Sequence, residues 1–381
     1  MLHFIKSRAH LLVAVGLLLI TLAVNISMPL FRAYAAASGF GNGQTSLVFA
    51  AYVLGMLPCY VFLGGISDRW GRKRVLLLAV VIAFCATLVI TIWPNVWALA
   101  IARFLQGVGV GIGMSAGTAY ISELLKEHPL AAYRAAGLAS LFTALGFGGG
   151  AIATTLVLLF HYSLSPVSYW LLLLLTAIAG SLLFFLPKLP PIGGKLLRLP
   201  YFPKGSLVPN VAIGICWAAT GVVIAIIPTQ LTAMGLAPYA GFCLVLINWS
   251  GAFLQPFIRK LNPSYSVQIG LYLIPVGFAA VIAGCMLGWL LLILFGTFII
   301  GLAAYGFSYL GGLAIVAEKG GVQKARAVSG YMFIGYIGFG IPAVLLGYLA
   351  DQFGIIQALT IFELAVVVLS GWMLWQLKKN K

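Results

Sequence analysis

Long apolar runs alternate with short polar breaks along the whole chain. A helix needs about 20 mainly apolar residues to cross the hydrocarbon core of a bilayer. The run 267–315 is long enough for two helices, and we place the break between them at Gly284–Gly288. The pattern predicts twelve spans, which puts both termini on one side. The predicted spans are residues 10–33, 46–65, 75–93, 96–120, 135–160, 168–187, 208–229, 239–258, 267–287, 289–315, 327–349 and 356–376.

Composition strengthens this interpretation. The chain is 62% hydrophobic and 7% charged, whereas soluble domains carry about 25% charged residues. Most of its surface must therefore face lipid, and we predict an all-α polytopic membrane protein. Lys6 and Arg8 before an apolar run imitate a signal peptide, but the run is too long, so we expect an uncleaved first helix. The five cysteines lie in apolar runs without a CxxC pair, which indicates neither a disulfide framework nor a metal site.

The positive charges predict the orientation. With the N-terminus inside, all 22 bases except Arg32 and Arg103 fall in cytoplasmic segments, as the positive-inside rule requires. We therefore expect a multi-pass protein of the plasma or inner membrane with both termini cytoplasmic. The net charge of +16 is spread over separate loops, so it sets topology and does not indicate nucleic-acid binding.

The longest polar break, Pro187–Pro209, is rich in proline and lysine. It predicts an N-terminal six-helix bundle at 1–187, a cytoplasmic linker at 188–207 and a C-terminal bundle at 208–381. The halves also repeat each other, because Arg134-Ala135 before Gly146-Phe147-Gly148 recurs 192 residues later as Arg326-Ala327 before Gly338-Phe339-Gly340. A parallel repeat of this kind is typical of transporter folds.

The loop between the second and third spans has the most specific sequence, Gly65-Ile66-Ser67-Asp68-Arg69-Trp70-Gly71-Arg72-Lys73-Arg74. It resembles the corresponding loop of major facilitator superfamily (MFS) transporters in both glycines, the acid and the basic cluster. Together with the repeat, the resemblance covers the whole chain. It implies two six-helix bundles that alternate access to a site at mid-membrane, and no enzymatic activity.

In that family the loop acid, a loop arginine and an acid at the end of helix 4 form a conformational latch. The resemblance assigns these roles to Asp68, Arg72 and Glu123. The alternative is that the bases only set topology, which explains Lys73 and Arg74 but not Asp68. The full set expected at the gate is Gly65, Asp68, Arg69, Gly71, Arg72, Glu123 and Arg134.

The fourth span contains Arg103 and, three residues later, Gln106-Gly107-Val108-Gly109, which is similar to the family's helix-4 motif. A charge at this depth costs at least about 2.5–3.5 kcal/mol on insertion scales, so Arg103 should face the interior. Gln106 shares its helix face. A purely structural arginine is the alternative to a functional one.

In this fold, helices 1, 4, 7 and 10 line the cavity, with 2, 5, 8 and 11 beside them. Their polar and aromatic residues are the candidates for substrate contact, although for each one singly helix packing is an equal alternative. Asn248 and Gln255 lie seven apart on one helix face. The set is Asn25, Arg32, Tyr52, Arg103, Gln106, Trp217, Thr220, Asn248, Trp249, Gln255, Tyr305, Tyr309 and Tyr336.

These candidates are mostly aromatic or amide side chains, which suits a small, partly apolar organic solute. The resemblance implies a monomeric secondary transporter without a cofactor, and we expect efflux by antiport. The glycine run in span 5 has Phe147 where the antiporter signature has proline, which weakens antiport. Alternatives are an organic-anion or siderophore-type transporter, an uncoupled exchanger, and, in another class, a lipid flippase or a non-transporting sensor.

Protons are a further candidate partner. Of the six acids, only Glu363 falls inside a predicted span, and desolvation there favours its protonated form. Asp351 is expected in the outer loop after helix 11. Coupling through Glu363 or through Asp68 and Glu123 competes with transport that has no proton step.

Overall fold

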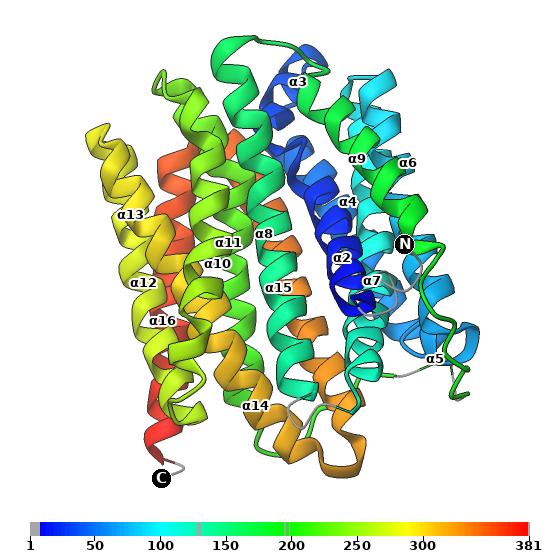
Figure 1. Cartoon of the computed structure of the whole chain (residues 1–381). Helices are drawn as coiled ribbons and strands as arrows, with labels where there is room; N and C mark the ends of the chain where they lie inside the picture. Colours follow the sequence, from blue (N-terminus) through cyan, green and yellow to red (C-terminus); the bar gives the residue numbers. More distant parts are fainter. Residues whose placement is uncertain (1–7, 128–130, 194–195, 198, 380–381) are drawn as a thin grey trace. The chain divides into compact units, whose positions relative to one another are not determined.

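The computed structural model describes residues 8–127, 131–193, 196–197 and 199–379, and these contain helices without any strand (Figure 1). Ten helical segments in this part of the chain are long and apolar enough to cross a membrane, and one of them, Leu290–Phe353, holds two predicted spans. The shorter apolar helix Val167–Leu183 accounts for the remaining span. The predicted all-α fold with twelve spans is therefore confirmed.

Contacts divide the chain into two units. Unit 1 comprises Met1–Tyr34 and Ala51–Arg198. Between its spans it holds one short helix, α5, in the Gly65–Arg74 loop. Its described elements are α2 (Ala9–Asn25), η1 (Met28–Leu30), α3 (Phe31–Ala37, shared with unit 2), α4 (Asn42–Phe62, also shared), α5 (Ile66–Trp70), α6 (Arg72–Ile92), α7 (Val96–Leu124), α8 (Ala131–Phe160) and α9 (Val167–Leu183).

Unit 2 comprises Ala35–Ala50 and Leu199–Lys381, so it includes the first part of α4. The predicted break at Gly284–Gly288 is confirmed, because α12 ends there and Gly288 adopts a φ of 69° that favours glycine. The described elements are α10 (Leu207–Ala233), η2 (Ala237–Tyr239), α11 (Ala240–Ile258), α12 (Pro263–Leu287), α13 (Leu290–Gly301), η3 (Leu302–Ser308), α14 (Tyr309–Gly320), η4 (Gly321–Gln323), α15 (Lys324–Phe353) and α16 (Ile355–Lys379).

The internal repeat appears in the packing of each unit. Gly146 of α8 lies against the backbone of Leu18 in α2, and Gly338 of α15 lies against the backbone of Gly214 in α10. A Cβ atom at either glycine would overlap a carbonyl oxygen. The glycines thus allow the two helices of each pair to approach closely, as is common in membrane bundles.

Two spans contain irregular turns that the hydrophobic pattern does not predict. The first span leaves the α-helix after Asn25 and passes through a 3-10 turn that begins at Met28-Pro29. The tenth span passes through the π-helical segment η3 between α13 and α14. Each irregular turn lies beside residues that the sequence singled out.

Candidate functional site

Three helices of unit 1 meet at one charged cluster. Arg72 Nη1 lies 2.5 Å from Asp68 Oδ1, and Arg72 Nε lies 2.8 Å from Glu123 Oε1. Nη1 also donates a hydrogen bond of 2.6 Å to Ser67 Oγ. One guanidinium therefore joins α5, α6 and the end of α7 through two carboxylates, a geometry for which the planar arginine fork is suited.

The turn between α5 and α6 brings these groups together. Gly71 has a φ of 90°, a backbone conformation that residues with a Cβ rarely adopt. The sharp turn that results sets Arg72 beside Asp68, four residues earlier. The main chain of the turn is also held by the segment after α9, because Gly193 N donates to Asp68 O at 3.0 Å and Gly65 N donates to Leu196 O at 3.2 Å.

Two residues of the predicted gate lie outside this cluster. Arg69 is exposed on α5, and Arg134 is exposed near the start of α8. Neither donates a hydrogen bond to another described residue, and the charge of Arg134 acts instead on His10 of α2. The structure thus brings together Asp68, Arg72 and Glu123 but not the two further arginines.

Arg103 is buried in unit 1, with 1% of its surface exposed. Its Nη1 donates to Val24 O at 2.9 Å and to Gln106 Oε1 at 3.2 Å. Gln106 Nε2 donates to Ala23 O at 2.7 Å. Both carbonyls belong to the last turn of α2, directly before the 3-10 turn at Met28–Leu30, so the two α7 side chains anchor the end of α2.

Aromatic and amide groups surround this anchor. The Arg103 Cζ atom lies 4.7 Å from the ring centre of Tyr52 and 5.9 Å from that of Phe31, within the range of cation–π attraction. Asn25 Nδ2 donates to Phe147 O of α8 at 2.9 Å. Arg32 lies half-buried on α3. Arg103 faces the interior as predicted.

Four of the other candidates converge in unit 2. The Trp217 ring of α10 has its centre 4.7 Å from that of Tyr336 in α15, 5.8 Å from that of Tyr305 in η3 and 6.3 Å from that of Tyr309 in α14. We call these four residues the aromatic cluster. Trp217 is 5% exposed, and its buried indole N–H has no hydrogen-bond partner among the described residues.

Local backbone features make room for the cluster. A Cβ atom at Gly335 would lie 2.9 Å from the Trp217 ring, and one at Gly251 would lie 2.6 Å from the backbone of Gly306. α11 can therefore approach the π-helical segment that carries Tyr305. Such segments occur often at functional sites.

Most of the remaining candidates make contacts with residues of their own helix. Thr220 and Asn248 each donate to a carbonyl of their own helix, at 3.0 and 2.8 Å. Trp249 packs edge-on against Phe253. Gln255 Oε1 accepts a hydrogen bond of 3.3 Å from Arg259 Nη2.

Arg259 is a residue that sequence reasoning assigned only to topology. In the structure it is partly buried at the end of α11, and its charge acts on Tyr309 of the aromatic cluster. The signal that identifies it is spacing, because it follows Gln255 by four residues and so shares its helix face.

Comparison with known proteins decides the family. The profile described as Major Facilitator Superfamily matches residues 13–332. The chain belongs to this superfamily.

Sequence relatives within the family match shorter stretches. Monosaccharide-sensing protein 3 of Arabidopsis thaliana is 33% identical over 150 residues, 38% of this chain and 20% of that protein. The 4-hydroxybenzoate transporter PcaK of Pseudomonas aeruginosa is 32% identical over 42% of this chain and 35% of its own. Multidrug resistance protein D of Escherichia coli is 36% identical over 27% of this chain and 25% of that protein. The chain thus spans about a fifth to a third of the length of these relatives.

Solved MFS structures match almost end to end. A mutant of the nucleoside transporter NupG aligns with a TM-score of 0.77 at 13% identity, over 97% of this chain and 98% of that one. The human organic anion transporter MFSD10 aligns with a TM-score of 0.70 at 18% identity, over 97% of this chain and 99% of that one. A D-xylose-proton symporter aligns with a TM-score of 0.72 at 16% identity, over 96% of this chain and 97% of that one. The predicted superfamily and fold are confirmed.

Proposed function

We propose that this protein is a secondary transporter that moves a small, partly apolar organic solute by alternating access, and that the aromatic cluster contacts the solute. The observation that carries the proposal is the buried indole N–H of Trp217, which has no acceptor among the described residues. An unsatisfied buried donor costs about 1–3 kcal/mol. An acceptor on a bound solute would remove that cost, while the tyrosine rings would cover its apolar part.

An anionic aromatic solute is the second candidate. Arg259 supplies a positive charge next to Tyr309, and an arginine fork binds carboxylates well. Relatives named for 4-hydroxybenzoate and for multidrug resistance are consistent with either solute. Efflux is the direction we propose, and the likeness to a proton symporter makes import the direct alternative.

A ligand screen tests the proposal. Purified protein is heated with aromatic acids, nucleosides, monosaccharides and drugs, and compounds that raise the melting temperature are tested again on Trp217→Phe. This change keeps a ring but removes the N–H, and we expect about tenfold weaker binding, equivalent to about 1.4 kcal/mol. Trp170→Phe, at an exposed position of α9, is the matched control. Equal loss in both variants, or in neither, would reject the aromatic cluster as the site.

For the gate, we propose that the Asp68–Arg72–Glu123 cluster is the conformational latch. Its support is geometric, since Arg72 of α6 is ion-paired both with Asp68 of α5 and with Glu123 at the end of α7. Gly65 and Gly71 then serve to place the charges. The latch is expected on the cytoplasmic side, in a monomeric protein of the plasma or inner membrane.

For energy coupling, we propose Glu363 of α16 as the proton carrier. It is half-buried, and its Oε2 atom is buried without a hydrogen-bond partner in the described part of the chain. A carboxyl in such a setting is more stable when protonated. Uncoupled exchange is the competing proposal.

A further inference from the structure

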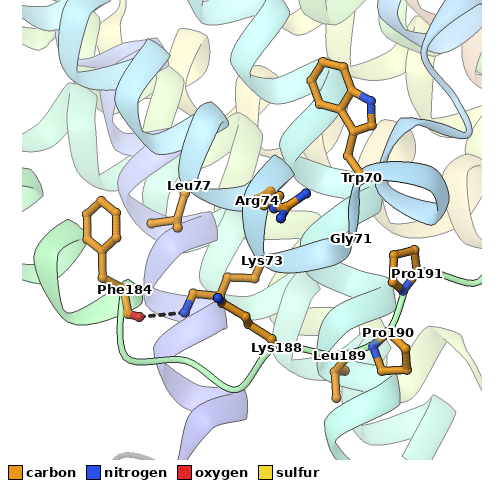
Figure 2. Close-up of a pocket in the computed structure, with 10 residues that line it drawn as sticks. All are labelled: Trp70, Gly71, Lys73, Arg74, Leu77, Phe184, Lys188, Leu189, Pro190 and Pro191. Carbon is orange, nitrogen blue, oxygen red and sulfur yellow. Dashed lines mark hydrogen bonds between the residues drawn. The ribbon is translucent and has the colours of Figure 1, made fainter.

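A basic pocket lies at the end of unit 1, beside the start of α6. Its cavity volume is about 660 Å³. The α5–α6 turn, the first turns of α6 and the segment that follows α9 line it (Figure 2). Arg72 belongs to the Asp68–Arg72–Glu123 cluster, whereas the next two residues, Lys73 and Arg74, line this pocket. The proposed function leaves these two cations unused.

Charge in the pocket has one sign only. Of its described lining residues, Lys73, Arg74 and Lys188 are cationic and none is acidic. Lys73 and Lys188 are near enough for their charges to repel each other, and Figure 2 shows them approaching the same space. Neither Arg74 nor Lys188 donates a hydrogen bond to another described residue. An anion would relieve this repulsion.

The side chain of Lys73 is fixed in position by two hydrogen bonds and can still bind an anion. Its Nζ atom donates to Phe184 O at 2.6 Å and to Leu186 O at 2.8 Å. An ammonium group has three donors, so one remains for a ligand. The pocket also adjoins the N-terminus of α6, which has no side-chain cap and whose dipole favours negative charge.

Apolar surface adjoins the cations and points to an amphiphile. Trp70 is 50% exposed and Phe184 is 63% exposed, and Leu77 extends the apolar lining along α6. The apolar helix α6, which is long enough to cross a membrane, begins here at Arg72, and a span that starts at this residue would place these side chains where headgroups meet acyl chains. Basic pockets between helices at this level bind lipid phosphates in other membrane proteins.

We propose that this pocket binds the phosphate group of an anionic phospholipid, with Lys73, Arg74 and Lys188 on the phosphate and Trp70 and Phe184 against the glycerol and upper acyl chain. A free phosphate would satisfy the cations but leave the apolar side chains uncovered. The lipid is therefore the occupant that fits both parts of the pocket.

Native mass spectrometry of the detergent-solubilised full-length protein tests this. The protein is titrated with phosphatidylglycerol and, separately, with phosphatidylcholine. We expect tighter binding of phosphatidylglycerol, and a loss of tenfold or more in its affinity in Arg74→Gln/Lys188→Gln. The matched control, Lys260→Gln/Lys378→Gln, removes two exposed charges outside the pocket and should bind like the unchanged protein.

Three results would overturn the proposal. They are equal affinity for the two lipids, an equal loss in both double variants, and displacement of the lipid by millimolar inorganic phosphate, which would identify a free-anion site. If the pocket variant does not fold, Lys188→Gln alone, in the non-helical segment after α9, keeps the test and should lose at least threefold.

Discussion

The carboxylate of Asp351 caps the N-terminus of α4 at Asn42. Its Oδ1 atom accepts hydrogen bonds from Asn42 N at 2.8 Å and from Asn42 Nδ2 at 2.9 Å, and its Oδ2 atom accepts one of 2.8 Å from Gly43 N. The expectation that Asp351 lies in a loop was wrong, because it lies in the last turn of α15. An acid at a helix N-terminus is stabilised by the helix dipole, and this one ties together two helices 309 residues apart in sequence.

We predict that Asp351→Asn lowers stability by about 1 kcal/mol, the usual worth of a helix cap and its charge–dipole interaction. Thermal unfolding in detergent micelles measures the change. The neighbouring exposed Gln352→Asn is the control and should melt with the unchanged protein. No difference between the two variants would mean that solvent replaces the cap without cost.

At the gate, we predict that Asp68→Asn leaves the protein folded but slows transport, because Arg72 loses one of its two carboxylates. Arg72→Lys should also be slow, since an ammonium group cannot span both acids as the fork does. The exposed Arg69→Gln serves as control. The measurement is solute flux in proteoliposomes at equal protein content. Normal flux in Asp68→Asn would contradict the proposal that this cluster is a latch.

For Arg103, we predict that alanine abolishes transport more completely than lysine and that both substitutions lower the melting temperature. The guanidinium binds Val24 O and Gln106 together, and each hydrogen bond to a charged group contributes about 1.5–3 kcal/mol. Lysine keeps the charge but not the fork. Wild-type flux in both variants, with reduced melting temperatures, would assign Arg103 to structure alone.

The repeat makes a packing prediction. Gly338→Ala should destabilise the protein by about 1–3 kcal/mol or more, because the new methyl group meets the backbone of Gly214. Gly137→Ala is the matched control, since nothing lies within 4 Å of a Cβ there. Melting temperatures of the two variants should differ clearly, and equal values would show that α10 and α15 can separate without cost.

For coupling, we predict that Glu363→Gln abolishes concentrative transport driven by a pH gradient and spares downhill exchange. The change removes the titratable proton while it keeps the size of the side chain. Flux with and without an imposed gradient is the measurement. Gradient-driven accumulation in the Gln variant would eliminate Glu363, and a wild-type protein that ignores the gradient would favour uncoupled transport.

The sequence was sufficient for the fold because the hydrophobic runs and basic loops follow directly from the membrane. It was also sufficient to pair Asp68, Arg72 and Glu123, through a loop with a specific order of residues. It could not place Asp351 on Asn42, because that contact depends on tertiary packing. For the same reason it could not show that Arg69 and Arg134, which it grouped with the gate, lie outside the ion-paired cluster, or that Arg259 donates a hydrogen bond to Gln255.

The π-helical segment η3 affects how this chain aligns with its relatives. A π-turn closes its hydrogen bond over five residues instead of four, so it holds one residue more than an α-turn. If a relative lacks the segment, an alignment that opens no single-residue gap within Leu302–Ser308 will be out of register on one side of it. Each residue there is then assigned to a helix face about 100° away from its true one, so positions equivalent to Tyr305 and Tyr309 can be compared only after that gap is placed.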